Sequence, residues 1–304
     1  MYKAGYLLGR FEQAVSVLPM SLRQAALRLP AEDRLTAEEL RLRAGRPPCV
    51  VLPGRERELL DRAVTGSDIM SVIEIATKAS AHWALSNVCS GFITIEGGHR
   101  LGLCGTAVMK EGDVMNLRDV SSVCLRIAKE NRGIAAPLLG QLTKSGVPTD
   151  TLIIAPPGGG KTTFLRDLVR LLSDGASGTY TRVALADERG EVAACCAGVP
   201  QLDVGSRTDV LTGCPKDKAV MMLLRSMSPG LVAVDEITAP EDLGAMRAAA
   251  NCGVRLLATA HAEDTRDLLR RPLYKELLES RLFSKAVTIT VVHGKREYRV
   301  EDLD

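Results

Sequence analysis

The sequence predicts an α/β protein with two domains, a smaller α+β domain followed by a domain built on a parallel β-sheet. From Thr151 onward, short apolar runs alternate with segments of helical periodicity, the pattern of parallel strands joined by crossover helices. Before that point, strand and helix patterns follow one another without this alternation. We therefore expect an α+β domain over residues 1–132, a linker region over 133–150 and the parallel-sheet domain over 151–304.

Composition argues against several classes of protein. The chain has 304 residues, of which 46% are hydrophobic, enough for two domains with sizeable cores. Residues 1–149 hold 19 Lys/Arg and 15 Asp/Glu and the remainder 20 and 22, so neither half is basic enough for a dedicated nucleic-acid binder. No signal-peptide pattern opens the chain and no apolar run approaches the ~18 residues of a membrane span, which favours a cytoplasmic protein. The eight cysteines form no C-x-x-C pair, so reduced thiols are expected rather than disulfides or a zinc site.

Helical periodicity marks three segments in the first half of the chain. The first covers residues 11–29 and is interrupted by Pro19. The second covers residues 68–83, with Ser67 as its expected N-cap. A further helix is expected between residues 133 and 150, where the domain boundary also falls.

The strands of the N-terminal domain are predicted from alternation and from turn residues. The stretch ELRLRAGRPPCVVLPG, residues 39–54, predicts a strand with one buried face, a turn at its Pro-Pro pair and a second short strand at 49–52. The stretch GFITIEGGHRLGLCGTAVM, residues 91–109, predicts two strands joined at Gly97–Gly98, which is a hairpin pattern.

The C-terminal domain is predicted to alternate strands and helices. Its strands are apolar throughout, as strands buried on both faces of a parallel sheet are. They are expected at residues 152–155, 182–186, 231–234 and 255–260. Helices are expected at residues 164–172, 216–227 and 241–251, and a final hairpin pairs residues 287–292 with 297–300 through HGKR.

The stretch APPGGGKTT lies between the first strand of this domain and the helix after it. It follows the phosphate-binding pattern G-x-x-x-x-G-K-[ST], except that Ala155 replaces the first glycine, one small residue for another. The three glycines allow a tight turn whose N–H groups point at phosphate oxygens. Lys161 supplies a positive charge, and the hydroxyl of Thr162 can ligate Mg²⁺. We therefore expect ATP and Mg²⁺ to bind here. The expected nucleotide-binding residues are Ala155, Pro156, Pro157, Gly158, Gly159, Gly160, Lys161, Thr162 and Thr163.

A pair of carboxylates, Asp235 and Glu236, ends the predicted strand 231–234. The carboxyl edge of an open α/β sheet is where ligands bind, so this pair is expected beside the glycine-rich loop. We expect Asp235 to hold Mg²⁺ through water and Glu236 to act as the general base toward an attacking water.

Two further strands end in polar residues at the same expected edge. Asp187, Glu188 and Glu191 follow the strand 182–186, and near a triphosphate they would require a cation such as Mg²⁺. The alternative is a charged surface turn. His261 follows the strand 255–260, where it could sense the γ-phosphate or have a structural role.

These four motifs, in this order, resemble those of the motor ATPases of type II secretion, type IV pili and type IV secretion. Residues 39–54 and the segment HRLGLCGTAV…VSSVCLRIAKE also resemble strands of the N-terminal domain of those enzymes. A closer resemblance, over nearly the whole chain, is to the stage III sporulation protein AA family. It rests on the phrases ELRLRAGRP, GFITIEGGHRLGLCGTAV, RTDVLTGCPK and RSMSPGLVAVDEI.

The resemblance implies a P-loop (RecA-like) ATPase acting in the mother cell of endospore-forming bacteria, at a transenvelope complex that links mother cell and forespore. It implies membrane proteins of that secretion-like complex as partners. It also implies a homo-oligomer in the form of a hexameric ring, placed in the cytoplasm at the inner face of a membrane.

In the motor ATPases that this chain resembles, arginines of the N-terminal domain reach the γ-phosphate, where they stabilise charge in the transition state. Arg100, Arg118 and Arg126 lie in the matching segment, and Arg225 is a weaker candidate. The chain departs from those motors at two points. Pilus motors often carry Gly-Glu where this chain has Asp235-Glu236, and the four-cysteine zinc insertion of type II secretion ATPases is absent from the sequence, so no zinc is expected.

Two alternatives to a motor ATPase are open to the sequence. A RecA-like ATPase that depends on nucleic acid would need a basic, aromatic-lined groove, yet aromatic residues make up only 3% of the chain. A nucleotide-gated scaffold with little turnover is the other, and the intact Asp235-Glu236 pair argues against it.

Overall fold

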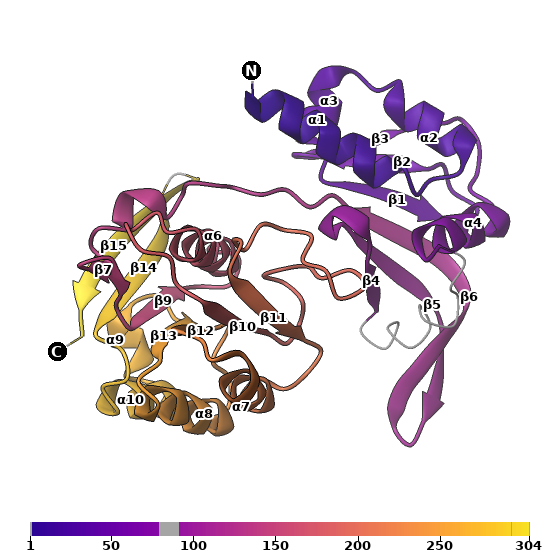
Figure 1. Ribbon diagram of the computed structural model, residues 1–304. Coiled ribbons are helices and arrows are strands. Elements are labelled where there is room, and N and C mark those ends of the chain that lie inside the picture. The colour runs from indigo at the N-terminus through magenta and orange to yellow at the C-terminus, as the bar shows by residue number, and fades with distance from the viewer. Residues whose placement is uncertain (1, 79–90, 293, 304) are drawn as a thin grey trace. The chain divides into compact units, whose positions relative to one another are not determined.

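The computed structural model describes residues 2–78, 91–292 and 294–303 (Figure 1). The chain forms two compact units. The first consists of Met1–Lys129 with Cys196–Gln201, and the second of Glu130–Cys195 with Leu202–Asp304.

The N-terminal unit is a six-stranded antiparallel sheet with helices on one face. The strands lie in the order β3-β2-β1-β6-β5-β4. They are β1 (Glu39–Arg43), β2 (Cys49–Leu52), β3 (Arg55–Glu58), β4 (Phe92–Thr94), β5 (Arg100–Lys110) and β6 (Asp113–Arg126). The helices are α1 (Tyr2–Val15), α2 (Met20–Leu27), α3 (Ala31–Thr36) and α4 (Gly66–Ala76). Leu40 and Leu42 of β1 are buried against the helices, while the other three residues of the strand are half-buried, so the predicted alternation is confirmed.

The strand pair around the Pro-Pro turn and the hairpin around Gly97–Gly98 are both present as predicted. The helical segment 11–29 is two helices, because Pro19 is the N-cap of α2. The prediction that Ser67 is the N-cap of α4 was wrong. Thr65 caps α4 instead: its hydroxyl accepts the N–H of Asp68 (3.1 Å), and the Asp68 carboxylate accepts the N–H of Thr65 (2.9 Å). This reciprocal pair satisfies two N–H groups that the helix cannot satisfy itself. α4 ends at Ala76, and residues 79–83 of the predicted helix lie outside the described residues.

The C-terminal unit is built on a seven-stranded sheet in the order β11-β10-β12-β13-β9-β14-β15. Neighbouring strands are parallel except for the β14–β15 hairpin, so the predicted parallel sheet is confirmed with one antiparallel edge strand. The strands are β9 (Thr151–Ala155), β10 (Val183–Asp187), β11 (Thr208–Thr212), β12 (Leu231–Val234), β13 (Arg255–His261), β14 (Lys285–Val292) and β15 (Lys295–Asp302). The helices are α6 (Lys161–Ser173), α7 (Lys216–Met227), α8 (Pro240–Asn251), α9 (Thr265–Leu268) and α10 (Pro272–Glu279).

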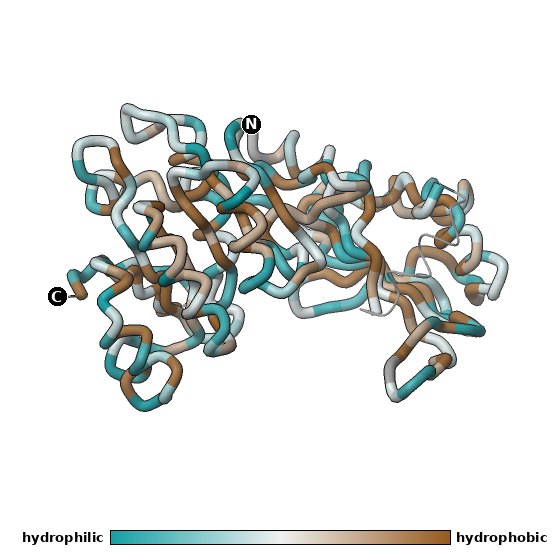
Figure 2. Tube along the Cα trace, turned by 60° about the horizontal axis from the view of Figure 1, so that its bottom comes forward, coloured by the Kyte–Doolittle hydropathy of each residue, from teal (hydrophilic) through white to brown (hydrophobic). Residues whose placement is uncertain are grey.

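Two apolar cores lie against the two faces of this sheet. α6 covers one face, and α7, α8 and α10 cover the other (Figure 1). Alternate residues of each central strand enter opposite cores, as Ile153 and Ile154 of β9 do. The central strands are therefore largely apolar. Figure 2 colours the chain by hydropathy, with apolar stretches in brown. This two-sided burial holds the strand ends, and the loops that follow them, in fixed positions.

Two differences from the predicted elements have physical causes. The prediction of a helix between residues 133 and 150 was wrong. This segment forms only a 3₁₀ turn (Ala136–Leu138) and the short strand pair β7 (Thr143–Lys144) and β8 (Val147–Pro148), because Pro137, Gly140 and other helix-breaking residues interrupt it. The Asp167 carboxylate of α6 fixes this segment by accepting the N–H groups of Gly133 and Ala135, both at 2.9 Å. Strand β11 was not predicted, since it is polar and only half-buried at the sheet edge.

No helix within the described ranges is long and apolar enough to cross a lipid bilayer.

His99 is a fully buried histidine of the N-terminal unit. Its Nδ1 accepts the N–H of Ala128 (3.1 Å), and its Nε2 has no hydrogen-bond partner among the described residues. Burial, together with the charge of the neighbouring Arg10 guanidinium, lowers the pKa of His99 to about 3. The imidazole is therefore neutral at pH 7, with its proton on Nε2.

We expect the protein to lose stability as the pH falls from about 6.5 toward 4. The unfolded His99 takes up a proton near its ordinary pKa, while the folded one resists until about pH 3, so acid favours the unfolded state. This group alone should lower the free energy of unfolding by up to about 1.4 kcal/mol per pH unit in that range. Urea unfolding between pH 4.5 and 7.5 measures the slope, which should be shallower for His99→Gln because glutamine cannot be protonated. A His99 ring signal that titrates near pH 6.5 in the folded protein would contradict this account.

Candidate nucleotide-binding site

The predicted site residues of the C-terminal unit come together because of the order of the strands. β13 lies between β12 and β9 and is parallel to both. The carboxyl ends of these three strands therefore meet at one edge of the sheet. His261 ends β13 with the glycine-rich loop on one side and Asp235–Glu236 on the other.

The glycine-rich loop has a backbone that side chains would not allow. Gly158 and Gly160 have φ values of +72° and +101°, in the left-handed region. A Cβ on Gly159 would lie 2.7 Å from the Cβ of Ala155 and 2.9 Å from the carbonyl oxygen of Pro156. Ala155 itself is fully buried in the core against α6, which explains why a methyl group is accepted at the first position of the motif.

Lys161 opens α6, and its ammonium group is held inside the site. Its Nζ donates to the carbonyl oxygens of Ala155 (3.0 Å) and Pro156 (3.3 Å) and lies 2.7 Å from Nδ1 of His261. Burial lowers the pKa of Lys161, and this is opposed by the charges of Glu236 and Asp235. A buried ammonium beside these carboxylates is suited to binding an anion of high charge.

His261 connects this lysine with Glu236. Since an ammonium can only donate, Nδ1 of His261 accepts from Lys161, and the ring proton lies on Nε2. Nε2 then lies 3.0 Å from Oε1 of Glu236. A single imidazole thus joins the phosphate-binding loop to the predicted general base.

Asp235 is held by two threonine hydroxyls. Thr162 donates to its Oδ2 (2.9 Å) and Thr259 donates to its Oδ1 (2.8 Å). Burial raises the pKa of Asp235, and the two hydroxyls reduce this rise. A half-buried carboxylate beside a threonine hydroxyl provides the oxygen ligands that Mg²⁺ prefers.

Glu236 has a strained backbone. Its φ of +61° lies in the left-handed region, which costs a non-glycine residue about 1–2 kcal/mol. The same Thr259 hydroxyl that donates to Asp235 accepts the N–H of Glu236 at 2.8 Å, so one side chain fixes both carboxylates. Thr259 was missed from the sequence, since a fully buried threonine inside an apolar strand gives no local indication of this role.

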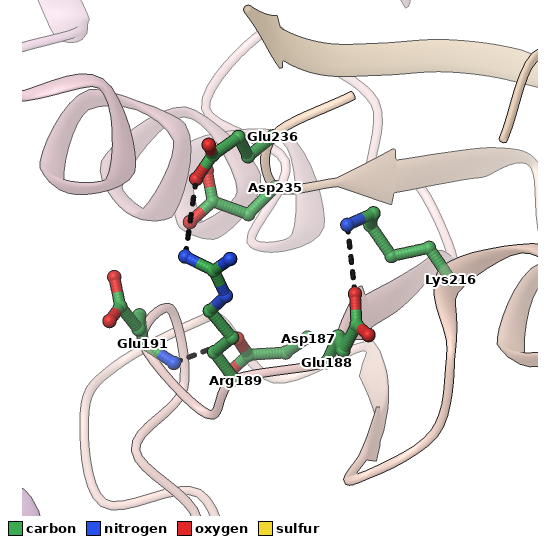
Figure 3. A pocket seen from close by; sticks show the side chains of 7 residues that line it. All are labelled: Asp187, Glu188, Arg189, Glu191, Lys216, Asp235 and Glu236. Carbon is green, nitrogen blue, oxygen red and sulfur yellow. Dashed lines mark hydrogen bonds and ion pairs between the residues drawn. The ribbon is translucent and has the colours of Figure 1, made fainter. Parts of the chain in front are cut away.

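The three acidic residues at the end of β10 and in the loop that follows it have different partners (Figure 3). Asp187 is used by the backbone, because its carboxylate accepts the N–H groups of residues 191–193 at 2.8–3.1 Å. Burial raises the pKa of Asp187, and these N–H groups counteract the rise. Glu188 instead accepts a hydrogen bond from Nζ of Lys216 at 2.8 Å. Glu191 lines the same small pocket as Asp235 and Glu236.

Two cations at this pocket were missed from the sequence. Lys216 is almost fully buried at the start of α7, where its Nζ also donates to the hydroxyl of Thr238 (3.1 Å). A lysine in the first turn of a helix opposes the helix dipole, and that pattern could have indicated a role. Arg189 has a largely exposed guanidinium, whose Nη1 lies 3.7 Å from Oε2 of Glu236 (Figure 3).

The predicted arginines lie elsewhere in the chain. Arg100 of β5 lies directly opposite Arg126 of β6. Arg118 is also on β6, where it is exposed and lies opposite Thr106 of β5. All three belong to the N-terminal unit, and their role stays a prediction. Arg225 is in the last turn of α7, at the opposite end of that helix from Lys216, so it does not join the site of its own unit.

Comparison with known proteins identifies the family. The model of the family "Sporulation stage III, protein AA" matches residues 9–300. The stage III sporulation protein AA of Bacillus subtilis is 38% identical over 283 residues, which cover 93% of this chain and 92% of the relative. This chain therefore belongs to the stage III sporulation protein AA family, as its motifs predicted.

Solved structures with the same fold include an ATPase and a pilus motor. The Legionella pneumophila ATPase DotB matches with a TM-score of 0.58 and 18% identity, covering 88% of this chain and 77% of that one. The pilus retraction motor PilT, solved with bound ADP, matches with a TM-score of 0.57 and 16% identity, covering 88% and 79%. The predicted fold, a RecA-like P-loop domain preceded by an α+β domain, is confirmed.

We expect Thr259→Val to disturb both carboxylates. Valine has the shape of threonine but leaves the N–H of Glu236 and one oxygen of Asp235 without their partner, which should cost about 1–3 kcal/mol of stability. Urea unfolding measures this loss. Thr259→Ser is the matched control, because it keeps the hydroxyl and removes only a methyl group. Equal stability of the valine variant and wild type would show that this hydroxyl does not hold the two carboxylates.

Proposed function

We propose that this member of the stage III sporulation protein AA family is a Mg²⁺-dependent ATPase that acts as the motor of a sporulation transenvelope complex. The observation that carries the proposal is the connected set of side chains at the carboxyl edge of the sheet. Lys161, His261 and Glu236 form one line of contacts across β9, β13 and β12. A P-loop lysine joined in this way to a carboxylate at the end of a neighbouring strand suits hydrolysis of a nucleoside triphosphate better than simple binding.

The residues present fit a magnesium ion. Thr162 and Asp235 offer oxygen ligands that are already in contact at 2.9 Å. The raised pKa of Asp235 reflects a carboxylate from which the surrounding protein excludes water, a charge that a divalent cation would stabilise. When bound, Mg²⁺ neutralises part of the phosphate charge, as in other P-loop ATPases.

Glu236 is the best-placed general base of the site. Its carboxylate is half-buried, and one oxygen lies 3.0 Å from Nε2 of His261 while the other lies 3.7 Å from Nη1 of Arg189. Glu188 is less suited, because the ammonium of Lys216 neutralises it at 2.8 Å. Asp187 is less suited too, since backbone N–H groups occupy both of its oxygens. Of these three carboxylates, Glu236 alone is neither hydrogen-bonded to an ammonium nor occupied by backbone N–H groups.

His261 is proposed as the sensor that couples the loop to the base. Lys161 must move toward phosphate oxygens to bind them, and any change in its contact with Nδ1 acts on the ring that also holds Glu236. The state of the phosphate can thus affect the orientation of the base through a single side chain.

The role of the N-terminal unit is proposed from an unusual pair of charges. Like charges directly opposite on neighbouring strands repel each other, yet Arg100 and Arg126 face each other across β5 and β6. Glu39 of β1 is 3.6 Å from Arg126 and offsets part of this charge. We propose that Arg100, Arg118 and Arg126 supply positive charge to the γ-phosphate. We further propose that the protein works as a homo-oligomeric ring, hexameric as in the motors it resembles, on membrane proteins at the inner face of a mother-cell membrane.

Glu236→Gln should remove hydrolysis while leaving nucleotide binding intact. Glutamine keeps the size and one acceptor oxygen but cannot take up the proton, and loss of a positioned base typically costs about 10²–10⁴ in rate. Single-turnover hydrolysis and equilibrium ATP binding, measured on one preparation, separate the two effects. Lys161→Ala is the contrasting variant, and it should weaken ATP binding itself.

Two outcomes would contradict this assignment. Turnover of Glu236→Gln near the wild-type rate would place the base elsewhere, with Glu188 as the next candidate. Unchanged ATP affinity of folded Lys161→Ala would remove the basis for the phosphate site.

Neutralising the N-terminal arginines should slow hydrolysis without weakening ATP binding. We expect Arg100→Gln, Arg118→Gln or Arg126→Gln to lower turnover by about 10³ where the replaced arginine contacts the γ-phosphate. Arg23→Gln is the control, because Arg23 is an exposed arginine on α2 of the same unit. Specific activity should also rise with protein concentration if a neighbouring copy supplies the arginine. Full activity in all three variants would exclude the proposed role.

A further inference from the structure

The C-terminal hairpin touches the glycine-rich loop through one residue that the motif does not include. Nε of Arg296, on β15, donates to the carbonyl oxygen of Gly159 at 2.9 Å. A Cβ on Gly160 would lie 2.6 Å from the same Nε, so the guanidinium packs directly against the backbone of the loop.

The position of Arg296 is set by the elements on both sides of the loop. β14 pairs in parallel with β9, the strand that enters the loop, and β15 pairs with β14 along its whole length. Two residues after Arg296, the ring of Tyr298 stacks on Phe164 of α6, the helix that leaves the loop, with 5.3 Å between ring centroids. Arg296 is therefore carried by a strand fixed both to the sheet and to the phosphate-binding helix.

The contact orients one peptide group of the loop. The carbonyl of Gly159 and the N–H of Gly160 belong to the same planar trans peptide, so they point in opposite directions. Holding the carbonyl outward with a guanidinium directs the N–H of Gly160 to the opposite side, and P-loops bind phosphate with such N–H groups. Both residues flanking this plane are glycines, which leave its orientation weakly determined by the chain itself.

We propose that Arg296 is a positioning residue that orients the Gly159–Gly160 peptide for phosphate binding, which makes the C-terminal hairpin part of the nucleotide site. This inference rests on the proposed function, ATP binding at the loop 155–163. The remaining guanidinium nitrogens of Arg296 have no hydrogen-bond partner among the described residues, and the side chain is exposed, so its charge also adds to the positive potential at the loop.

The test compares two arginines of one strand. Arg296→Ala removes the contact, and Arg299→Ala is the matched control, because Arg299 is 79% exposed and pairs with Glu301. Binding of ADP, measured by calorimetry, should weaken about tenfold in Arg296→Ala and stay within twofold of wild type in Arg299→Ala. Arg296→Lys keeps a charged donor and should recover part of the affinity. If Arg296 only stabilised the fold, Arg296→Ala would lower the melting temperature, and Arg296→Lys would not recover the affinity for ADP.

Hydrogen exchange supplies a readout that does not depend on nucleotide. The amides of residues 158–161 should exchange faster in Arg296→Ala than in Arg299→Ala, because the loop is no longer held from outside; Pro156 and Pro157 have no amide hydrogen. Equal ADP affinity and equal exchange in the two variants would overturn the inference. If wild type and Lys161→Ala bind ADP equally, the proposed function fails instead, while exchange still decides whether Arg296 holds the loop.

Discussion

The parallel pairing of β13 with β12 on one side and β9 on the other is the constraint on which the site depends. Parallel neighbours end at the same edge, so the loop after β9, the carboxylates after β12 and His261 are brought within hydrogen-bond distance of one another. Because these strands lie between two apolar cores, a shift in register would draw the polar residues at their ends into a core, which costs free energy. The spacing of the polar groups at this edge is thus fixed by the packing of the sheet.

A second constraint is that charged groups at this edge must be compensated. Asp187 is satisfied by backbone N–H groups, Glu188 by the ammonium of Lys216, and Asp235 by two threonine hydroxyls. These three carboxylates are therefore used to hold the surrounding structure in place. Glu236 differs from the others in its strained backbone and in contacts with His261 and Arg189 that leave it half-exposed. Strain concentrated at one carboxylate is common where a side chain must be aimed at a ligand.

The C-terminal unit also stabilises the outer side of the glycine-rich loop. The hairpin β14–β15 continues the sheet beyond β9, and its residues Tyr298 and Arg296 contact the helix and the loop. The buried Arg166 of α6 donates to the carbonyl oxygens of Glu191 and Val192, which ties the acidic loop to the same helix. α6 is therefore in contact with both the acidic loop and the C-terminal hairpin, so a change at its first turn can affect both.

The sequence by itself determined the local features of this protein. The phosphate-binding motif, the apolar strands and the polar residues that end them follow from spacing and periodicity. All six strands predicted for the C-terminal unit, including the two of the final hairpin, are present. The sequence also placed Asp235, Glu236 and His261 at the ends of these strands. Only the tertiary structure decided which polar groups are partners. The contacts of four side chains join residues that are 23 to 137 positions apart in the chain; these are Thr259, Lys216, Arg189 and Arg296. The order of strands in the sheet, which brings these residues together, is not encoded in any local pattern. Hydrogen bonds between non-consecutive strands depend on that order, which is why the roles of these residues appear only in the folded chain.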